Sequence, residues 1–131
     1  MKKLTLILIL IATSVFAQDP KAGVNSVGAW DAPVDNVDLT PITEPLTYEV
    51  GMFPEVLPGV VASAIKVVPV DGLKVNFNNL GTLTSGTYHF SVRAVNSFNN
   101  KSEWARLKVT YSNKVPLPPK NITITFTIEG E

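Results

Sequence analysis

Few side chains in this sequence are of the types that carry enzyme chemistry. The chain has one histidine, His89, and no cysteine, which excludes a thiol nucleophile and a cysteine-ligated zinc site. No Gly-x-Ser-x-Gly segment marks a serine nucleophile. His89 shares one face of a strand-like segment with Ser91 and Arg93, which is typical of an ordinary surface histidine. We therefore expect a protein that is not an enzyme and that has no cofactor.

Three carboxylates crowd one Pro-rich and Asp-rich segment, at Asp31, Asp35 and Asp38. Carboxylate oxygens are ligands that Ca²⁺ prefers, so a calcium site is one interpretation. The other is a solvated turn, in which Asp side chains hydrogen-bond to their own backbone. The spacing differs from that of an EF-hand loop, so we favour the turn and expect no metal site.

Two aromatic residues near a polar loop are candidate ligand contacts, Phe98 and Trp104. Trp104 has outward parity at the start of a predicted strand, and Phe98 lies in the loop before it. An exposed ring beside Asn side chains could stack on a sugar. The alternative, which we favour, is that Trp104 covers the rim of the fold, because large aromatic side chains are mostly buried.

The elements that must position these residues are β-strands. No helical periodicity follows residue 17, and short alternating runs are separated by Gly, Pro, Asn and Asp, which predicts an all-β sandwich of about seven strands. Alternation also predicts that Tyr48, Tyr88 and Phe90 point into the core. The predicted strands are 24–30, 46–53, 60–70, 72–80, 87–96 and 103–112.

Residues 1–17 have the pattern of a secretory signal peptide. Lys2 and Lys3 precede an apolar run, and Val15 and Ala17 fit a cleavage site after Ala17. The apolar run is shorter than the ~20 residues that a membrane span needs. We expect a protein without a membrane span that is secreted to the extracellular space or cell surface.

The part that remains after cleavage would be residues 18–131. Removal of Lys2 and Lys3 leaves nine Lys and Arg against eleven Asp and Glu, a net charge of −2. A nearly neutral domain lacks the basic surface that nucleic-acid binding requires, so no nucleic-acid partner is expected. Without cysteine, an exported domain of this size must be stabilised by its core rather than by disulfides.

Three segments together resemble a fibronectin type III domain, an immunoglobulin-like sandwich: "GAWDAP", "PITEPLTYEV" and "LTSGTYHFSVRAVNSFNNKSEWA". The resemblance covers about residues 27–112. It implies that Trp30 is the core tryptophan and that Tyr88 is the tyrosine-corner residue, whose hydroxyl bonds back to the preceding chain. Ser26 and Gly28 depart from the family's large aliphatic residues. A strand glycine can mark the close approach of another backbone.

The C-terminal residues form a strand pattern of their own. In residues 121–131, "NITITFTIEGE", apolar side chains alternate with threonine, and the Pro-rich linker 115–120 separates them from the domain 18–114. The family's first strand has no counterpart at the N-terminus, where only "QDPKAG" precedes Val24. The resemblance therefore implies a first strand displaced to the C-terminus. Its apolar residues, the candidates for self-association, are Ile122, Ile124, Phe126 and Ile128.

Three fates are open to this segment: a disordered tail, pairing with its own domain, or entry into a neighbouring copy. A disordered tail would expose the apolar face. Pairing with its own domain is limited by a linker that reaches at most about 22 Å, against the roughly 33 Å of a ten-residue strand. We favour entry into a neighbour, as in β-strand addition.

The function predicted from the sequence is that of a secreted, non-enzymatic structural subunit that forms homo-oligomers or filaments by donating its C-terminal strand. The alternative is a monomeric secreted binding or adhesion module for glycan or a cell-surface protein. One form of that alternative is a phage-encoded protein that acts at the host surface.

Overall fold

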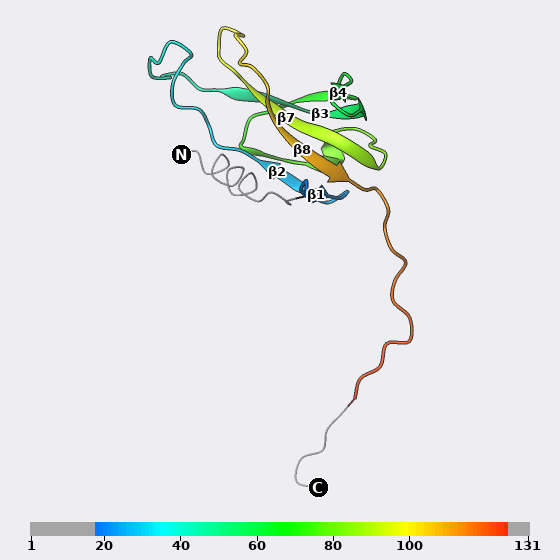
Figure 1. The fold of residues 1–131 in the computed structure, drawn as a ribbon. Coiled ribbons are helices and arrows are strands. Elements are labelled where there is room, and N and C mark those ends of the chain that lie inside the picture. The colour runs from blue at the N-terminus through cyan, green and yellow to red at the C-terminus, as the bar shows by residue number, and fades with distance from the viewer. Residues whose placement is uncertain (1–17, 126–131) are drawn as a thin grey trace, which may run out of the picture.

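A computed structural model describes residues 18–125, and their regular structure is almost entirely β. Figure 1 shows strands packed as a sandwich, from which the C-terminal part of the chain projects. The predicted signal peptide, residues 1–17, lies outside the described residues, as do Phe126 and Ile128. Among residues 18–125, no helix is long and apolar enough to cross a membrane.

The larger sheet has the strand order β1-β8-β7-β3-β4, and β5 also pairs with β3. Neighbouring strands are antiparallel, except that β1 runs parallel to β8. Its strands are β1 (Lys21–Ala22), β3 (Thr47–Leu57), β4 (Val60–Val61), β5 (Val67–Val70), β7 (Gly86–Val95) and β8 (Ala105–Tyr111).

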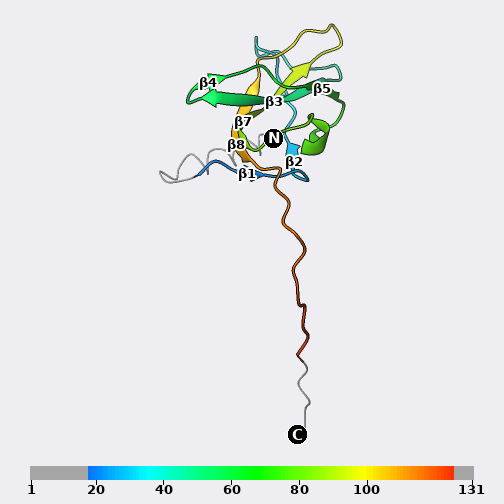
Figure 2. The same cartoon turned by 90° about the vertical axis from the view of Figure 1, so that its right-hand side faces the viewer.

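The second sheet consists of two short antiparallel strands, β2 (Val27–Ala29) and β6 (Lys74–Asn76). A single turn of 3₁₀-helix, η1 (Phe77–Asn79), follows β6 directly. Figures 1 and 2 show β2 lying across one face of the larger sheet. The all-β sandwich predicted from the alternating pattern is thereby confirmed.

The core lies between the two sheets and is rich in aromatic rings. Phe77 stacks on Phe90 with ring centroids 5.2 Å apart, and Trp30 contacts Tyr48 edge-on at 5.5 Å. Each such contact adds about 0.5–1.5 kcal/mol to the free energy gained from burying the rings. The structure places the four predicted core residues in this cluster: Trp30, Tyr48, Tyr88 and Phe90.

Tyr88 has a polar role in addition to its packing. It is buried in β7, and its hydroxyl donates to the carbonyl oxygen of Thr84, 2.7 Å away. This bond ties β7 to the turn before it, as the tyrosine-corner expectation requires. A single buried hydrogen bond of this kind contributes about 1 kcal/mol net.

Two parts of the predicted strand pattern differ from the structure. The segment 60–70 is two strands: β4 pairs with the end of the eleven-residue β3, and β5 pairs with its beginning. A turn at Gly59, with φ of 78°, precedes β4. In the predicted strand 72–80, Leu73 has the same parity as the buried Val75 and Phe77, yet it is 44% exposed because it lies before the first residue of β6.

Gly28 permits the close approach of a side chain rather than of another backbone. A Cβ atom added to Gly28 would lie 2.2 Å from Cζ of Phe90. The ring of Phe90 is buried and stacked on Phe77, so it cannot move aside freely. The absence of a side chain at Gly28 is therefore what allows β2 to lie on Phe90.

We predict that Gly28→Ala lowers the free energy of unfolding by about 1–3 kcal/mol, because the added methyl overpacks the core. The measurement is urea denaturation of the mature protein. Gly72→Ala is the matched control, since nothing lies within 4 Å of a Cβ at that position. Equal effects of the two substitutions would contradict the packing of β2 on Phe90.

Candidate functional site

The chain leaves the sandwich at the end of β8 and makes few further contacts. The Asn113 backbone N–H donates to Ser85 Oγ (3.0 Å), and Ser85 Oγ donates to the side-chain oxygen of Asn113 (2.8 Å). Beyond Lys114, residues 115–125 make no hydrogen bond, ion pair or strand pairing with the rest of the described chain. Figures 1 and 2 both show these residues running away from the sandwich.

The apolar side chains of this segment point into solvent. Ile122 is 82% exposed and Ile124 is 73% exposed. Asn121 before them has φ of 55°, a left-handed conformation that Asn tolerates better than most residues. Residues 121–125, which we call the C-terminal segment, therefore present an uncovered apolar face. Its predicted continuation, Phe126 and Ile128, lies outside the described residues.

Two N-terminal residues, Lys21 and Ala22, do form a strand, although the sequence showed no counterpart of a first strand there. The N–H of Thr110 donates to the carbonyl oxygen of Pro20 (2.9 Å), and that of Ser112 to the carbonyl oxygen of Ala22 (3.0 Å). These bonds attach β1 to the edge of β8, not to β2. Among residues 18–125, β2 consequently pairs with β6 alone.

An apolar groove of about 420 Å³ lies beside the unpaired edge of β2. One wall is β2 itself, and the other is residues 105–107 and 109 of β8. Phe77, Phe90 and Val92 lie beneath, and residues 20–22 stand at one end. We call this space the β2–β8 groove.

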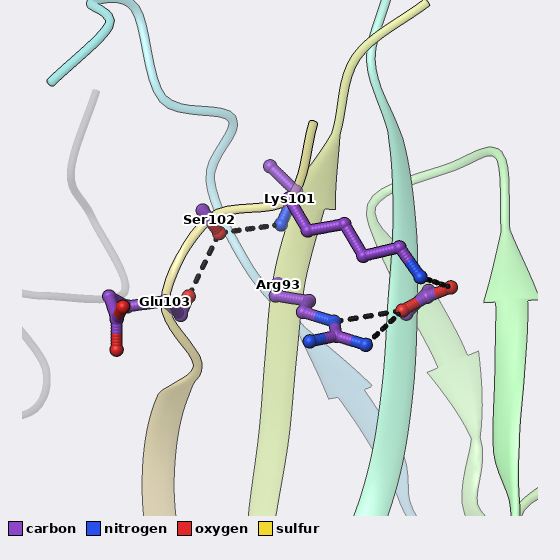
Figure 3. Close-up of polar contacts among 6 residues, drawn as sticks. Arg93, Lys101, Ser102 and Glu103 are labelled. Atoms are coloured by element: carbon purple, nitrogen blue, oxygen red, sulfur yellow. Dashed lines mark hydrogen bonds and ion pairs between the residues drawn. The ribbon is translucent and has the colours of Figure 1, made fainter. Parts of the chain in front are cut away.

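The outer face of the larger sheet carries a network of charged groups. Arg93 donates through Nε to Glu49 Oε1 (2.8 Å), and Lys101 Nζ lies 3.1 Å from Glu49 Oε2. Figure 3 shows both cations reaching the same carboxylate. Burial opposes ionisation of Glu49, but the two cations outweigh it and lower the pKa of Glu49. The network therefore ties β3, β7 and the turn after β7 together.

The ring of Trp104 is part of this outer-face network. The guanidinium of Arg93 lies 4.3 Å from the ring centroid, and Phe53 contacts the ring edge-on at 5.1 Å. Arg106 in turn lies over Phe53 at 4.5 Å. Phe98 is 77% exposed on the preceding turn and makes no ring contact with Trp104 within the described chain. The rings of Phe98 and Trp104, the two candidate ligand contacts, therefore do not form one continuous aromatic surface.

Sequence reasoning missed the partner of His89. His89 Nε2 lies 2.7 Å from Glu55 Oε1, and Lys108 Nζ lies 3.5 Å from Glu55 Oε2. The hydrogen bond from His89 and the charge of Lys108 lower the pKa of Glu55. Ser91 Oγ donates to the backbone carbonyl of His89. No hydroxyl within residues 18–125 forms a hydrogen bond with the imidazole ring of His89. The arrangement stabilises an ion pair and supplies no nucleophile.

The Asp-rich segment is held by local hydrogen bonds. Asp38 Oδ1 accepts from the hydroxyl (2.6 Å) and the backbone N–H (3.1 Å) of Thr40, which lowers the pKa of Asp38. Within residues 18–125, no three His, Asp or Glu side chains are grouped closely enough to hold a metal ion. The hydrogen bonds between Asp38 and Thr40 are local, as in a turn.

Comparison of the chain with protein-family models, with curated proteins and with solved structures gives no match. The fibronectin type III resemblance accordingly stays a prediction that depends on three sequence motifs.

We predict that Glu55→Gln destabilises the protein at pH 7 and that its effect disappears on acidification. Because the folded state lowers the pKa of Glu55, its stabilisation is present above the unfolded pKa of about 4.3 and is lost as pH falls through the folded value. Denaturant melts between pH 3 and pH 7 measure the difference from the unmodified protein. The control is Glu103→Gln, at an exposed side chain outside these ion pairs, which should show no such trend. An effect of Glu55→Gln equal at pH 3 and pH 7 would contradict the ion pair.

Proposed function

We propose that this chain is an exported, non-enzymatic structural subunit that joins other copies of itself by donating residues 121–128 as a β-strand. The observation that carries the proposal is the exposure of Ile122 and Ile124 on a stretch whose described part, residues 121–125, forms no hydrogen bond or strand pairing with its own sandwich. Strand β2 of the same molecule has an edge without a partner in the described chain. One molecule thus holds both an uncovered apolar segment and an unpaired strand edge.

Energetics explain why the segment must find an edge. Burying each Ile or Phe side chain contributes roughly 1.5–3 kcal/mol. Ordering each residue costs about 1–2 kcal/mol of backbone entropy. Over seven residues these amounts nearly cancel, so the segment does not order on its own. Backbone hydrogen bonds to an open strand edge shift the balance toward a paired state.

Chain geometry favours donation to another copy over pairing within one molecule. The segment leaves from the Tyr111 end of β8, and the seven residues of β8 span about 23 Å. To lie antiparallel to its own β2, the segment would first have to return along that whole length. The linker 115–120 reaches only about 22 Å, and its prolines favour an extended course.

The predicted leader and the fibronectin type III resemblance also support a structural role outside the cell. The leader 1–17 predicts secretion, and the fibronectin type III resemblance implies a domain type used for structure and binding. Such a domain without disulfides gains stability when a neighbour completes its sheet and buries more apolar surface. A secreted subunit of this kind would form chains outside the cell.

A second candidate function is supported by Phe98. Its ring is exposed at the turn between β7 and β8, where its backbone N–H donates to the side chain of Asn96 (3.0 Å). A fixed, exposed aromatic side chain on a loop is a typical contact for a glycan or a protein. In this alternative the protein is a secreted monomer that binds or adheres through that turn.

The test of strand donation compares two acidic substitutions on opposite faces of the segment. We predict that the mature protein forms concentration-dependent chains, detected by light scattering and negative-stain microscopy. Ile124→Asp should abolish them, because it places an unpaired charge on the face to be buried. The matched control Thr125→Asp puts the same charge on the other face and should still assemble.

A mature protein that stays monomeric at all concentrations would overturn the proposal and favour the binding module. Equal assembly of the Ile124→Asp and Thr125→Asp variants would show that the segment is not the joint. A closed symmetric dimer would retain the donated strand but exclude open chains, since a reciprocal exchange closes on itself.

A further inference from the structure

We infer that the β2–β8 groove is the acceptor, and that it takes residues 121–128 of another copy in a direction antiparallel to β2 and parallel to β8. This inference depends on the proposed strand donation and identifies the site that accepts the donated strand. Four features of the groove carry it: the backbone groups on its edge, the uncovered side chains of β8, its apolar lining, and the direction in which it is open.

The backbone of β2 directs unused hydrogen-bonding groups toward the groove. The N–H of Trp30 donates to the carbonyl oxygen of Leu73 (3.0 Å), so the even-numbered residues near β2 face β6. In an antiparallel ladder, the residues between them direct their N–H and C=O to the opposite edge. Val27 and Ala29 therefore point these groups away from β6, where no described strand pairs with them. An incoming strand can form hydrogen bonds with the N–H and C=O groups of both residues.

Side chains on β8 show where a neighbour is missing. Val109 and Tyr111 have inward parity and are buried. Ala105 and Leu107 have the same parity, yet Ala105 is exposed and Leu107 is only partly buried. Both residues line the groove. The loss of burial along one face of a single strand marks the place that an additional strand would cover.

The lining of the groove matches the apolar face that the sequence predicts for residues 121–128. Phe77, Phe90 and Val92 offer an apolar surface to Ile and Phe side chains, while the alternating Thr residues would remain toward solvent. Trp30 also lines the groove, and its buried indole N–H has no acceptor within residues 18–125. A donated strand brings backbone carbonyls to this wall.

A second groove of about 400 Å³ lies between β5 and β6 and is a poorer acceptor. Its lining includes Lys74, Asn76 and Asn79, which do not suit an apolar strand face. The adjoining strand β5 contains Pro69, which has no N–H to offer. The apolar segment therefore fits the β2–β8 groove better.

The direction of the donated strand follows from the two ends of the groove. Residues 20–22 stand beside Thr110 and Tyr111, so that end is blocked. At the other end Ala105 is exposed, so an incoming chain can reach the groove from that side. A strand that comes in there runs parallel to β8, whereas each subunit's own segment departs from the Tyr111 end. Successive copies are then joined head to tail in one orientation, which gives an open chain rather than a ring or dimer.

The test is disulfide cross-linking between single-cysteine variants, because the natural chain has no cysteine. Mature Ala29→Cys is mixed with mature Thr123→Cys or Thr125→Cys carrying a mass tag, and oxidised under assembling conditions. Cross-strand neighbours have Cβ atoms about 4.5–5.5 Å apart, near the distance that a disulfide needs. We expect a mixed dimer from Ala29→Cys with at least one of the two Thr variants.

Lys74→Cys is the matched control, because Lys74 lies opposite Ala29 in the β2–β6 ladder and lines the competing groove. It should give no mixed dimer. A second variant, Ala29→Pro, removes the N–H directed at the groove and leaves the bonds to β6. It should raise the concentration needed for assembly by about tenfold while the fold persists in denaturant melts.

The outcomes separate the two proposals. If unmodified protein assembles but Ala29→Cys gives no mixed dimer, or Lys74→Cys gives one instead, the groove assignment is overturned and strand donation stands. If Ala29→Pro assembles as readily as the unmodified protein, the groove assignment is likewise overturned. If the unmodified protein does not assemble at all, strand donation fails and the groove assignment fails with it.

Discussion

Strand β2 is paired on one side only, and most features of this molecule are related to that fact. Its partner β6 is three residues long, so the second sheet covers the first only in part. The ring of Phe90 lies directly under Gly28 and fills the core beneath the sheet, but among residues 18–125 no strand pairs with the other edge of β2. Backbone groups and apolar side chains at that edge remain open to water, which is costly in a sandwich of this size.

The C-terminal segment, in turn, has apolar side chains that nothing in the described chain covers. Ile122 and Ile124 are exposed on a stretch too short to bury them by itself. In our proposal, the C-terminal segment of one copy pairs with the open edge of β2 in a neighbouring copy. Backbone hydrogen bonds form along that edge, and the apolar face of the segment becomes buried. Charged groups on the outer face of the larger sheet are already paired within the subunit, Glu49 with Arg93 and Glu55 with His89. Assembly would therefore extend the core and leave this outer face unchanged.

The sequence was sufficient to predict the strands whose alternation is long and regular. Tyr48, Val50 and Met52 are buried as their parity indicates. It could not predict that Lys21 and Ala22 would pair with β8, because two residues carry no periodicity. Nor could it pair His89 with Glu55, 34 residues away, since such contacts depend on the register of two strands. The exposure of Ala105 depends on a missing neighbour, which no local pattern encodes.

Amide hydrogen exchange at β2 would test the central claim most directly, because it reports on the edge that the donated strand should cover. The mature protein would be compared, at an assembling concentration, with the monomeric Ile124→Asp variant. Our account predicts that the amides of Val27 and Ala29 exchange slowly in the assembly and rapidly in the monomer, and that residues 122–126 become protected together with them. Equally rapid exchange of Val27 and Ala29 in both samples, with the protein assembled, would contradict it.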